Sequence, residues 1–396
     1  MSDPEGGPLH GVVVIEFGNL IAAPYAGMLL ADLGARVIKV EPRSGDLGRQ
    51  FGPYQKGESV FFMAVNRGKE SVALDTKDWV SKRVLDNLVR KADVVLNNLR
   101  HGAMDRLGLG EERCRELNPG LIYAVVSAFG ADGPYAKRAG IDVIFQGESG
   151  MISITGDPKD GPHKTATTIG DYVAGSNMAL SIAAALAEHP RRGRRIDVSL
   201  RDGLLAVQSG WNAINFVTHS QPERTGTASP FLAPNQVFEA ADGPFTLAIV
   251  SDRHFELLCD AIERPDLARD YPTNADRMGD RESLTRKLSR VFKTEPVEYW
   301  IDLLEQAGLP VGRVLTITEA FDDPQARHNE MLVEFEHPVA GHVRTTGSPL
   351  RIDGAQARAD GQPPLLGQHT RAVLKEMGVD SATIETMIEE GRAVAS

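Results

Sequence analysis

Cysteine is scarce in this sequence: the chain has two, Cys114 and Cys259, which lie far apart and belong to no CxxC pair. This spacing argues against a disulfide framework and a cysteine zinc site, so we expect two small buried residues. No apolar run approaches the roughly 18 residues of a membrane span. The N-terminal segment MSDPEGGPLHG has neither the basic start nor the apolar core of a signal peptide. We therefore expect a cytoplasmic protein without a membrane partner.

Basic residues are in the minority, with 43 Lys and Arg against 54 Asp and Glu and a formal net charge of −11. Without a Lys/Arg-rich block, the chain lacks the electrostatic footprint that nucleic acid requires, so we expect no nucleic-acid partner. Its 396 residues, 42% hydrophobic and 24% charged, have an ordinary globular composition. This length predicts about two domains and a large core.

Several familiar site motifs are also missing. No HxxxH or HExxH pair is present, so we expect no metal ion, and no GxSxG elbow supports a serine hydrolase. The segment Gly18–Pro24 lacks the GxGxxG fingerprint of dinucleotide folds, although Glu41 stands where a ribose-binding acid would. Among the histidines only His369, which begins a helix after a Gly/Pro linker, stays open as a functional residue.

Hydrophobic patterning predicts an α/β fold. A strand over Val12–Phe17, a helix over Leu20–Leu33 and a strand over Val37–Val40 make a β-α-β opening. The pattern recurs with a helix capped by Asp78 and further buried strands, Val94–Leu96 and Leu121–Val126. The sequence therefore predicts a doubly wound, mostly parallel, Rossmann-like sheet.

Composition shifts near residues 221–234 and 321–328 predict the domain joints. We expect a large domain over residues 1–220, a smaller α+β domain over 225–325 and a C-terminal segment over 330–396. In the smaller domain one strand is clear, Phe245–Val250, and three stretches favour helices: Arg253–Ile262, Arg281–Phe292 and Val297–Gln306. Gly341–Leu350 predicts a later strand, and two short helices should close the chain.

Polar residues follow the predicted strands at the edge where parallel α/β sheets bind ligands. Asn98 offers both a donor and an acceptor, and Arg43, Arg100 and Arg106 can present planar donor forks to phosphate oxygens. Each residue taken alone fits an ordinary turn or a solvated surface. Their shared position at strand ends favours a binding site.

Asp171 is the carboxylate of greatest interest. It precedes Ser176–Ala187, whose Ala, Ser and Gly content predicts a closely packed helix. Asp171 can be the N-cap of that helix, a nucleophile, or both. A carboxylate stabilised at a helix start should stay ionised at neutral pH.

The motifs together resemble those of the class III CoA-transferases (CaiB/BaiF group). That family includes formyl-CoA and carnitine CoA-transferases and, as a divergent branch, the α-methylacyl-CoA racemases. The matching stretches run in the family's order over nearly the whole chain: Leu33–Pro42, Asn66–Ser71, Leu107–Gly110, Asn118–Tyr123, Ser127–Gly130, Gly133–Tyr135, Gly170–Asp171 and Leu366–Thr370.

The resemblance implies a transfer of CoA from an acyl-CoA donor to a carboxylic acid, centred on Asp171. The carboxylate would pass through an aspartyl anhydride and an aspartyl-CoA thioester, which keeps the thioester energy from water. CoA and acyl-CoA would be substrates, with no permanently bound cofactor. By residue-to-residue match, the residues along the CoA would be Ala22, Arg43, Leu74, Asn98, Leu99 and Arg106.

The resemblance also implies an intertwined, ring-like homodimer, with the C-terminal segment returning to the large domain. Leu99 stands where the family often has Phe, and Thr225–Phe231 has one glycine where formyl-CoA transferases have a glycine-rich loop, which disfavours oxalate and formate as the substrate pair. Arg138 or Arg224 could pair with the second carboxylate of a dicarboxylic acid, and succinyl-CoA is a possible donor.

Two alternatives remain open at this point. A racemase-like isomerase would need a histidine directly before the aspartate of a GHD segment, whereas this chain has Ile141 there. A catalytically silent CoA-binding subunit would keep the fold without the chemistry. The presence of Asp171 argues against the silent subunit.

Overall fold

The computed structural model describes residues 7–188, 190, 192–359 and 361–396. The chain divides into two compact units. The first, here called the sheet unit, comprises Met1–Gly150, Thr165–Ala213 and Pro324–Ser396, and the second, here called the small unit, comprises Met151–Lys164 and Ile214–Asp323. Among the described residues, no helix is both long enough and apolar enough to span a membrane.

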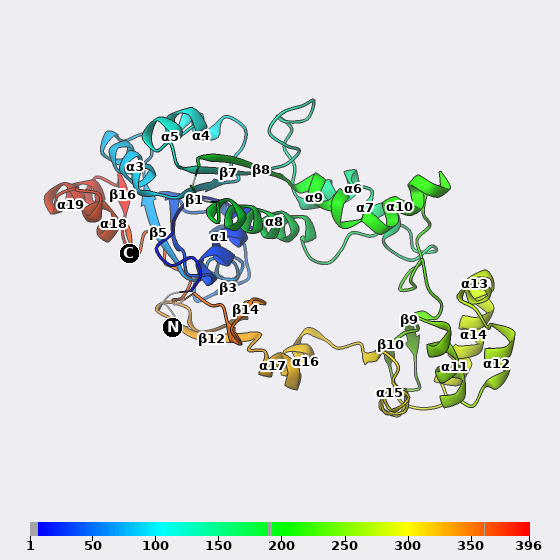
Figure 1. Cartoon of the computed structure of the whole chain (residues 1–396). Helices are drawn as coiled ribbons and strands as arrows, with labels where there is room; N and C mark the ends of the chain where they lie inside the picture. Colours follow the sequence, from blue (N-terminus) through cyan, green and yellow to red (C-terminus); the bar gives the residue numbers. More distant parts are fainter. Residues whose placement is uncertain (1–6, 189, 191, 360) are drawn as a thin grey trace. The chain divides into compact units, whose positions relative to one another are not determined.

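The sheet unit is built on a seven-stranded sheet in the order β16-β5-β2-β1-β6-β7-β8 (Figure 1). Its strands are β1 (Val13–Phe17), β2 (Arg36–Pro42), β5 (Lys69–Leu74), β6 (Val94–Asn97), β7 (Ile122–Ser127), β8 (Arg194–Ser199) and β16 (Ala393–Val394). Among the described residues of this sheet, only the pairing of β16 with β5 is antiparallel. The other six strands have the doubly wound Rossmann order, which confirms the predicted mostly parallel α/β fold.

Helices cover both faces of this sheet. One layer holds α1 (Ala22–Asp32) and α8 (Ile169–Leu186), which pack on each other, and the other holds α3 (Trp79–Lys91), α5 (Glu111–Leu117), α18 (Thr370–Glu376) and α19 (Ser381–Glu389). The second layer buries Ile15, Val72 and Val95 with the apolar faces of its helices. As predicted, the Asp78 side chain caps α3 by accepting from the Ser81 N–H.

Shorter elements complete the sheet unit. They are η1 (Leu47–Gln50), α2 (Val60–Met63), α4 (Ala103–Arg106), α6 (Asp142–Glu148), α9 (Leu200–Val207), α17 (Pro324–His328) and the hairpins β3 (Tyr54–Gln55) with β4 (Glu58–Ser59), β12 (Leu332–His337) with β13 (Gly341–Thr346), and β14 (Arg351–Ile352) with β15 (Ala355–Gln356). Helix α10 (Ser209–Thr218) follows α9, and none of its residues is buried.

The small unit has an antiparallel sheet in the order β11-β10-β9, with helices around it. Its elements are α7 (Met151–Ile154), β9 (Asn235–Glu239), β10 (Pro244–Ala248), α11 (Asp252–Ala261), α12 (Pro265–Asp270), α13 (Asn274–Gly279), α14 (Arg281–Phe292), α15 (Val297–Gln306), β11 (Val311–Arg313) and α16 (Ile317–Asp322). The Phe292 ring lies 5.0–5.2 Å from those of Phe238, Phe245 and Trp300. This aromatic cluster is the centre of the small unit's core.

The C-terminal segment closes the outer edge of β5. The His369 ring accepts a hydrogen bond from the Ser71 N–H at 3.1 Å, and the Thr370 hydroxyl accepts one from the Ala73 N–H at 3.1 Å. Strand β16 continues this pairing through Ala393 and Leu74. His369 therefore has a structural role at the sheet edge.

Candidate active site

A cavity of about 200 Å³ opens at the carboxyl edge of the large sheet. It lies between the ends of β1 and β6, where the strand order reverses and where open α/β sheets bind their ligands. Its lining comes from several strand ends and comprises Phe17, Gly18, Asn19, Val40, Glu41, Pro42, Asp46, Thr76, Leu99 and Leu107. The predicted residue Leu99 is therefore part of this cavity.

Asn98 fixes one wall of the cavity through the loop after β1. Its Oδ1 accepts from the Asn19 N–H at 2.8 Å, and its Nδ2 donates to the Asn19 carbonyl oxygen at 2.9 Å. This two-way pairing uses both ends of the amide that the sequence singled out. The side chain of Asn98 holds the loop, while the neighbouring Leu99 faces the cavity.

Two predicted arginines flank this cavity in the sequence. Arg43 follows the lining residue Pro42, and Arg106 precedes Leu107, which also lines it. Both arginines are exposed. Arg43 donates to the Gly391 carbonyl oxygen at 2.6 Å and pairs with Asp75 at 3.6 Å, and about half of its side chain is exposed. The remaining two predicted CoA residues are almost fully buried: Leu74 in the core of the sheet unit and Ala22 in the first turn of α1.

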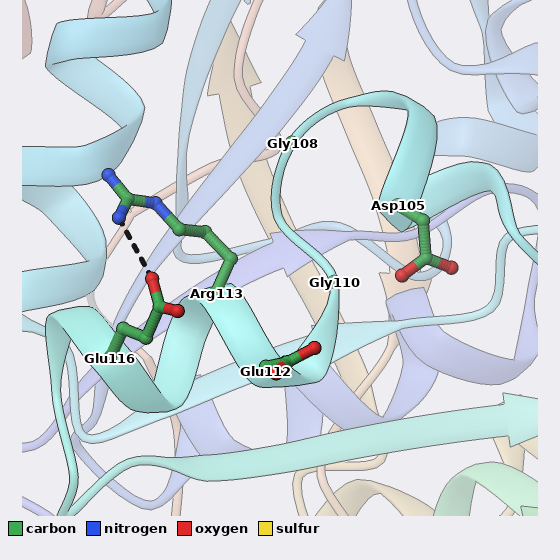
Figure 2. Close-up of a pocket in the computed structure, with 6 residues that line it drawn as sticks. All are labelled: Asp105, Gly108, Gly110, Glu112, Arg113 and Glu116. Atoms are coloured by element: carbon green, nitrogen blue, oxygen red, sulfur yellow. Dashed lines mark hydrogen bonds and ion pairs between the residues drawn. The ribbon is translucent and has the colours of Figure 1, made fainter.

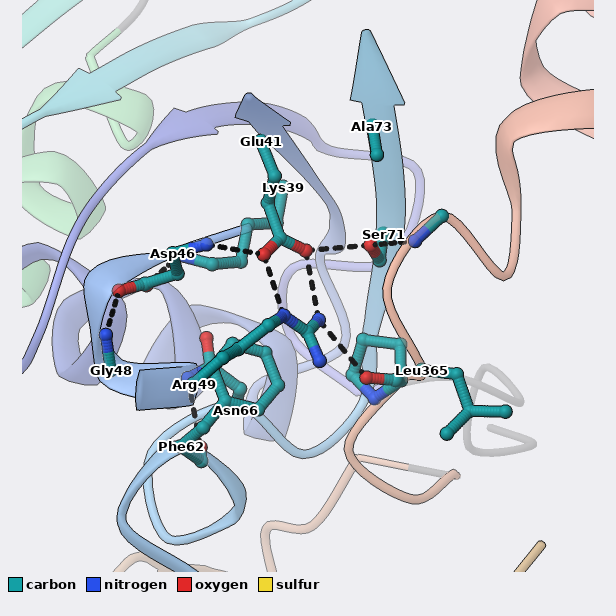
Figure 3. A network of polar contacts seen from close by, with 12 residues as sticks. Lys39, Glu41, Asp46, Gly48, Arg49, Phe62, Asn66, Ser71, Ala73 and Leu365 are labelled. Atoms are coloured by element: carbon teal, nitrogen blue, oxygen red, sulfur yellow. Dashed lines mark hydrogen bonds and ion pairs between the residues drawn. The ribbon is translucent and has the colours of Figure 1, made fainter. Parts of the chain in front are cut away.

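A cluster of buried charges adjoins the cavity, and two of its members, Glu41 and Asp46, belong to the lining (Figure 3). Lys39 donates to Glu16 at 2.8 Å and to the Gly18 carbonyl oxygen at 2.7 Å, and it pairs with Asp46 at 2.8 Å. Lys69 contacts the other oxygen of Glu16 at 2.7 Å. Burial disfavours the ammonium of Lys39, but the carboxylates of Asp46 and Glu16 outweigh it and raise the lysine pKa.

Glu41 belongs to the same cluster. Arg49 binds its carboxylate with two hydrogen bonds, of 2.7 and 2.9 Å, and the Ser71 hydroxyl donates to it at 2.6 Å. These partners hold the pKa of Glu41 below its usual range against the opposing effect of burial. Glu41 is therefore engaged by the protein itself rather than free to bind a ribose.

Sequence reasoning missed this cluster, although a signal was present. Glu16 interrupts the apolar run of β1, and Lys39 and Glu41 occupy alternate positions of the apolar strand β2. Side chains at alternate positions share one face of a strand. Since Glu16 is paired with Lys39, and Lys39 with Ser71, the register places these side chains in one row across three strands.

Asp171 lies in the first turn of α8, at the same edge of the sheet as the cavity. Parallel strands require that α8, which connects β7 to β8, begin at the carboxyl edge, where α1 also begins. The two helices meet closely, because a Cβ on Gly175 would lie 2.7 Å from the Ala22 carbonyl oxygen. The rings of Tyr25 and Tyr172 also pack edge to face at 4.9 Å.

The predicted capping role of Asp171 is wrong. The helix begins earlier than Ser176, with Thr168 at the N-cap position, and Asp171 is the third helical residue. The Gly170 N–H instead donates to the Asp142 carboxylate at 2.7 Å. Asp142, at the start of α6, thus accepts from a free N–H group at the start of α8, which is the capping role that the sequence assigned to Asp171.

The expectation that Asp171 stays fully ionised at neutral pH is also wrong. Burial and the nearby carboxylate of Asp142 raise the pKa of Asp171 to about 7. Burial removes water from the charged form, and a second carboxylate repels the charge. Such a shift is typical of groups with a chemical role, although structural groups also show it.

The remaining candidates are not part of the cavity lining. The Arg138 guanidinium is held by Glu148 at 2.6 Å and stacks on the rings of Phe129 and Tyr135. Arg224 belongs to the small unit, where it donates to the Ser153 carbonyl oxygen at 3.5 Å. Ile141 precedes α6 and is 63% exposed. Both cysteines are buried, as expected.

A second cavity lies around α5 (Figure 2) and is lined by Asp105, Gly108, Gly110, Glu112, Arg113 and Glu116. Three of these residues are acidic. The cation in this set, Arg113, is already paired with Glu116 at 3.1 Å and with Asp86 at 2.7 Å. The acids of this lining outnumber its cation and would repel phosphates. The two acids that line the cavity at the carboxyl edge, Glu41 and Asp46, are instead neutralised by Arg49 and Lys39, so that cavity is the better candidate for CoA.

Comparisons with known proteins agree with this geometry. The model of CoA-transferase family III matches residues 9–370. The chain is 39% identical to an acetyl-CoA:oxalate CoA-transferase of Acetobacter aceti, over 88% of this chain and 90% of that protein. It is 34% identical to the succinyl-CoA:glutarate CoA-transferase of Mus musculus, over 97% and 90% of the two chains.

A solved structure shares the whole fold. The crystal structure of a CaiB/BaiF family protein from Brucella suis superposes with a TM-score of 0.83 at 32% identity, covering 94% of this chain and 100% of that one. The family resemblance drawn from the motifs is thus confirmed. This chain belongs to CoA-transferase family III and is an enzyme that transfers CoA between an acyl-CoA and a carboxylic acid.

Proposed function

We propose that Asp171 is the nucleophile of this CoA transfer and that the cavity at the carboxyl edge holds the CoA. One observation carries the proposal: a half-buried carboxyl group, raised in pKa to about 7, lies at the ligand-binding edge of the sheet. A carboxylate that is poorly stabilised in its charged form is readily acylated.

In the first half of the reaction, a carboxylate oxygen of Asp171 attacks the thioester carbonyl of the donor. The C–S bond breaks, giving a mixed anhydride and the CoA thiolate. The thiolate then attacks the carbonyl carbon of Asp171, and the donor acid leaves with the bridging oxygen. The aspartyl-CoA thioester that remains conserves the energy of the original thioester.

In the second half, the acceptor carboxylate attacks the aspartyl thioester and expels the CoA thiolate. A new anhydride joins Asp171 to the acceptor acyl group. The thiolate attacks the acceptor carbonyl carbon, and the bridging oxygen stays with Asp171. The products are the acceptor acyl-CoA and a free carboxylate on Asp171, so atoms and charge balance over the cycle.

CoA would lie with its phosphates toward Arg43 and Arg106 and its less polar parts against Leu99. Both guanidiniums are exposed, and each adjoins a residue of the cavity wall. Arginine binds phosphate oxygens with a planar fork of donors. Asn98 would act indirectly, by holding the loop at Asn19 that forms one side of the cavity.

We propose short dicarboxylic acids as acceptors, with succinyl-CoA as a donor. Oxalate and glutarate, which occur in the names of two similar enzymes, are both dicarboxylates. Oxalate therefore returns to the panel of acids to be tested, despite the single glycine in Thr225–Phe231. Arg138 is a candidate for the second carboxylate, which would replace Glu148 as its partner.

We also propose that the enzyme is a homodimer. Helix α10 has no buried residue, and its Phe216 and Val217 are 71% and 79% exposed. Leu180 on α8 is 70% exposed. Three large apolar side chains exposed on helices favour a protein interface. Equilibrium sedimentation of the purified chain would measure its assembly state.

Oxygen transfer provides the test of the nucleophile. The enzyme is incubated with succinyl-CoA and an acceptor acid labelled with ¹⁸O in its carboxyl groups, and the peptide containing Asp171 is analysed by mass spectrometry. We expect ¹⁸O in Asp171, because the acceptor leaves its bridging oxygen there. Asp171→Asn should lose at least about 10⁴-fold in rate.

Asp202→Asn is the matched control, because Asp202 is also an acid in the first turn of a neighbouring helix, α9, and is exposed. It should keep the normal rate. Formation of acyl-CoA without ¹⁸O in Asp171 would refute the nucleophile. CoA binding without turnover for every donor and acid tested would favour the catalytically silent subunit.

A further inference from the structure

The loop that forms one side of the cavity contains an unusual backbone conformation. Leu20 has a φ of +64°, in the left-handed region that favours glycine. A side chain at such a φ costs about 1 kcal/mol or more. Surrounding contacts must therefore hold Leu20 in place.

Asp46 and Lys39 supply those contacts. The Leu20 N–H donates to Asp46 Oδ1 at 3.0 Å, and Lys39 donates to the Gly18 carbonyl oxygen at 2.7 Å. The loop is thus held at both ends by side chains that are themselves joined, since Lys39 Nζ lies 2.8 Å from Asp46 Oδ2. The two side chains form a clasp around Gly18–Leu20.

The clasp is itself fixed on several sides. Asp46 Oδ1 also accepts from the Gly48 N–H at 2.7 Å, and the Asp46 N–H donates to Glu41 at 2.9 Å (Figure 3). Glu16 binds the other side of Lys39 at 2.8 Å. The side chains of Lys39 and Asp46 are both 0% exposed, so water cannot replace these contacts.

We propose that Asp46 and Lys39 are positioning residues for the acyl-CoA: they hold the loop Gly18–Leu20 in the shape that receives it. This inference rests on the proposed CoA site, because the loop matters for CoA only if CoA lies in that cavity. The main-chain groups of Gly18 and Asn19 then reach their positions before the substrate arrives, which removes the cost of ordering them on binding.

Another buried ion pair of the same unit provides a comparison. Asp32 and Arg67 are joined by two hydrogen bonds, of 3.0 and 2.5 Å, at the opposite end of α1 from the loop. Both are buried, as Asp46 and Lys39 are. Breaking either pair should destabilise the fold, but only the clasp should change CoA binding.

The test measures CoA binding by calorimetry and the KM for succinyl-CoA in the full-length enzyme. Asp46→Ala should raise both the Kd of CoA and the KM on the order of tenfold, with kcat at saturation within about twofold. Asp46→Asn retains an oxygen that can accept from Leu20, so it should raise them less, by about threefold. Asp32→Ala should leave both constants unchanged while lowering the melting temperature.

Rescue distinguishes positioning from general destabilisation. Glycine adopts a positive φ without a steric cost, so Leu20→Gly in the Asp46→Ala background should recover part of the lost CoA affinity. A merely structural role predicts no such recovery. An Asp46→Ala enzyme whose Kd and KM match those of Asp32→Ala would overturn the proposal.

A variant of the cavity wall distinguishes the role of the clasp from the proposed CoA site on which it depends. Leu99→Trp narrows the cavity while leaving both residues of the clasp unchanged, and it should weaken CoA binding strongly if the cavity is the CoA site. Weak binding in Leu99→Trp with normal binding in Asp46→Ala would refute the clasp alone. Normal binding in both variants would refute the site and the clasp together.

Discussion

The sheet unit treats buried carboxylates in two opposite ways. Beside the cavity, Glu16 and Asp46 contact lysine ammonium groups at 2.7–2.8 Å, and Asp46 has a lowered pKa despite its burial. At the start of α8, Asp171 lies near a second carboxylate, Asp142, and its pKa is raised to about 7. One region stabilises its charges, and the other leaves a charge poorly stabilised.

This difference distinguishes carboxylates that stabilise the fold from a carboxylate that is suited to react. A carboxylate with several partners is held still and is a poor nucleophile, because an attack would break those contacts. A carboxylate with few partners costs stability but reacts more easily, as expected of active sites that trade stability for function. Four substitutions test this difference between the two regions.

Removing the shared cation should have the largest effect. Lys39→Met leaves the buried carboxylate of Asp46 without its lysine and should lower the free energy of unfolding by about 3–5 kcal/mol. Urea denaturation measures this loss. The double variant Lys39→Met/Asp46→Asn should regain part of it, and a loss below about 1 kcal/mol would mean that the charges are not stabilising each other.

Crowding the carboxylate of Glu16 should cause the second-largest loss of stability. A Cβ at Gly27 would lie 2.1 Å from an oxygen of Glu16 and 3.3 Å from the ammonium of Lys69. Gly27→Ala should therefore cost about 1–3 kcal/mol. Glu16→Asp shortens the side chain and should restore part of the stability in the double variant, whereas additive losses would show that the clash is not the cause.

Neutralising the poorly stabilised carboxylate should do the reverse and stabilise the fold. Since the folded-state pKa of Asp171 is raised to about 7, folding favours the protonated form, and the stability associated with it is lost as pH rises through about 7. Asp171→Asn should thus add about 1–3 kcal/mol at pH 8 and little at pH 4. Thermal unfolding at both pH values measures this gain.

The smallest effect should come from the neighbour that repels Asp171. Asp142→Asn keeps an oxygen that can accept from the Gly170 N–H but removes the charge. The pKa of Asp171 should fall, moving the acidic limb of the pH profile of kcat/KM down by about 1 unit. Burial, the larger cause, remains. An unmoved limb would mean that Asp171 does not limit the rate at low pH.

Hydrophobic patterning predicted much of the sheet unit and its helices. The predicted strands at Val94–Leu96 and Leu121–Val126 match β6 and β7, because buried strands are nearly continuous in apolar residues. It missed β8, Arg194–Ser199, which contains two arginines and an aspartate and lies at the sheet edge. An edge strand needs no continuous apolar run, so its pattern is weak.

The sequence predicted less of the candidate site than of the fold. Asp171 stood out through its motif, but its raised pKa depends on burial and on Asp142, which the fold brings near and no local pattern connects to it. The clasp has the same origin. Asp46 follows a strand and reads as a turn residue, and only the folded chain brings it to the Leu20 N–H. Contacts between distant segments decide such features.

The closure of β5 by the C-terminal segment has a consequence for synthesis on the ribosome. Ser71 and Ala73 receive their partners from His369 and Thr370, and Leu74 pairs with Ala393 near the end of the chain. The edge of β5 therefore stays open until residues 369–394 have been synthesised. An open strand edge can pair with other chains, so the nascent protein should depend on chaperone protection until β16 emerges from the ribosome.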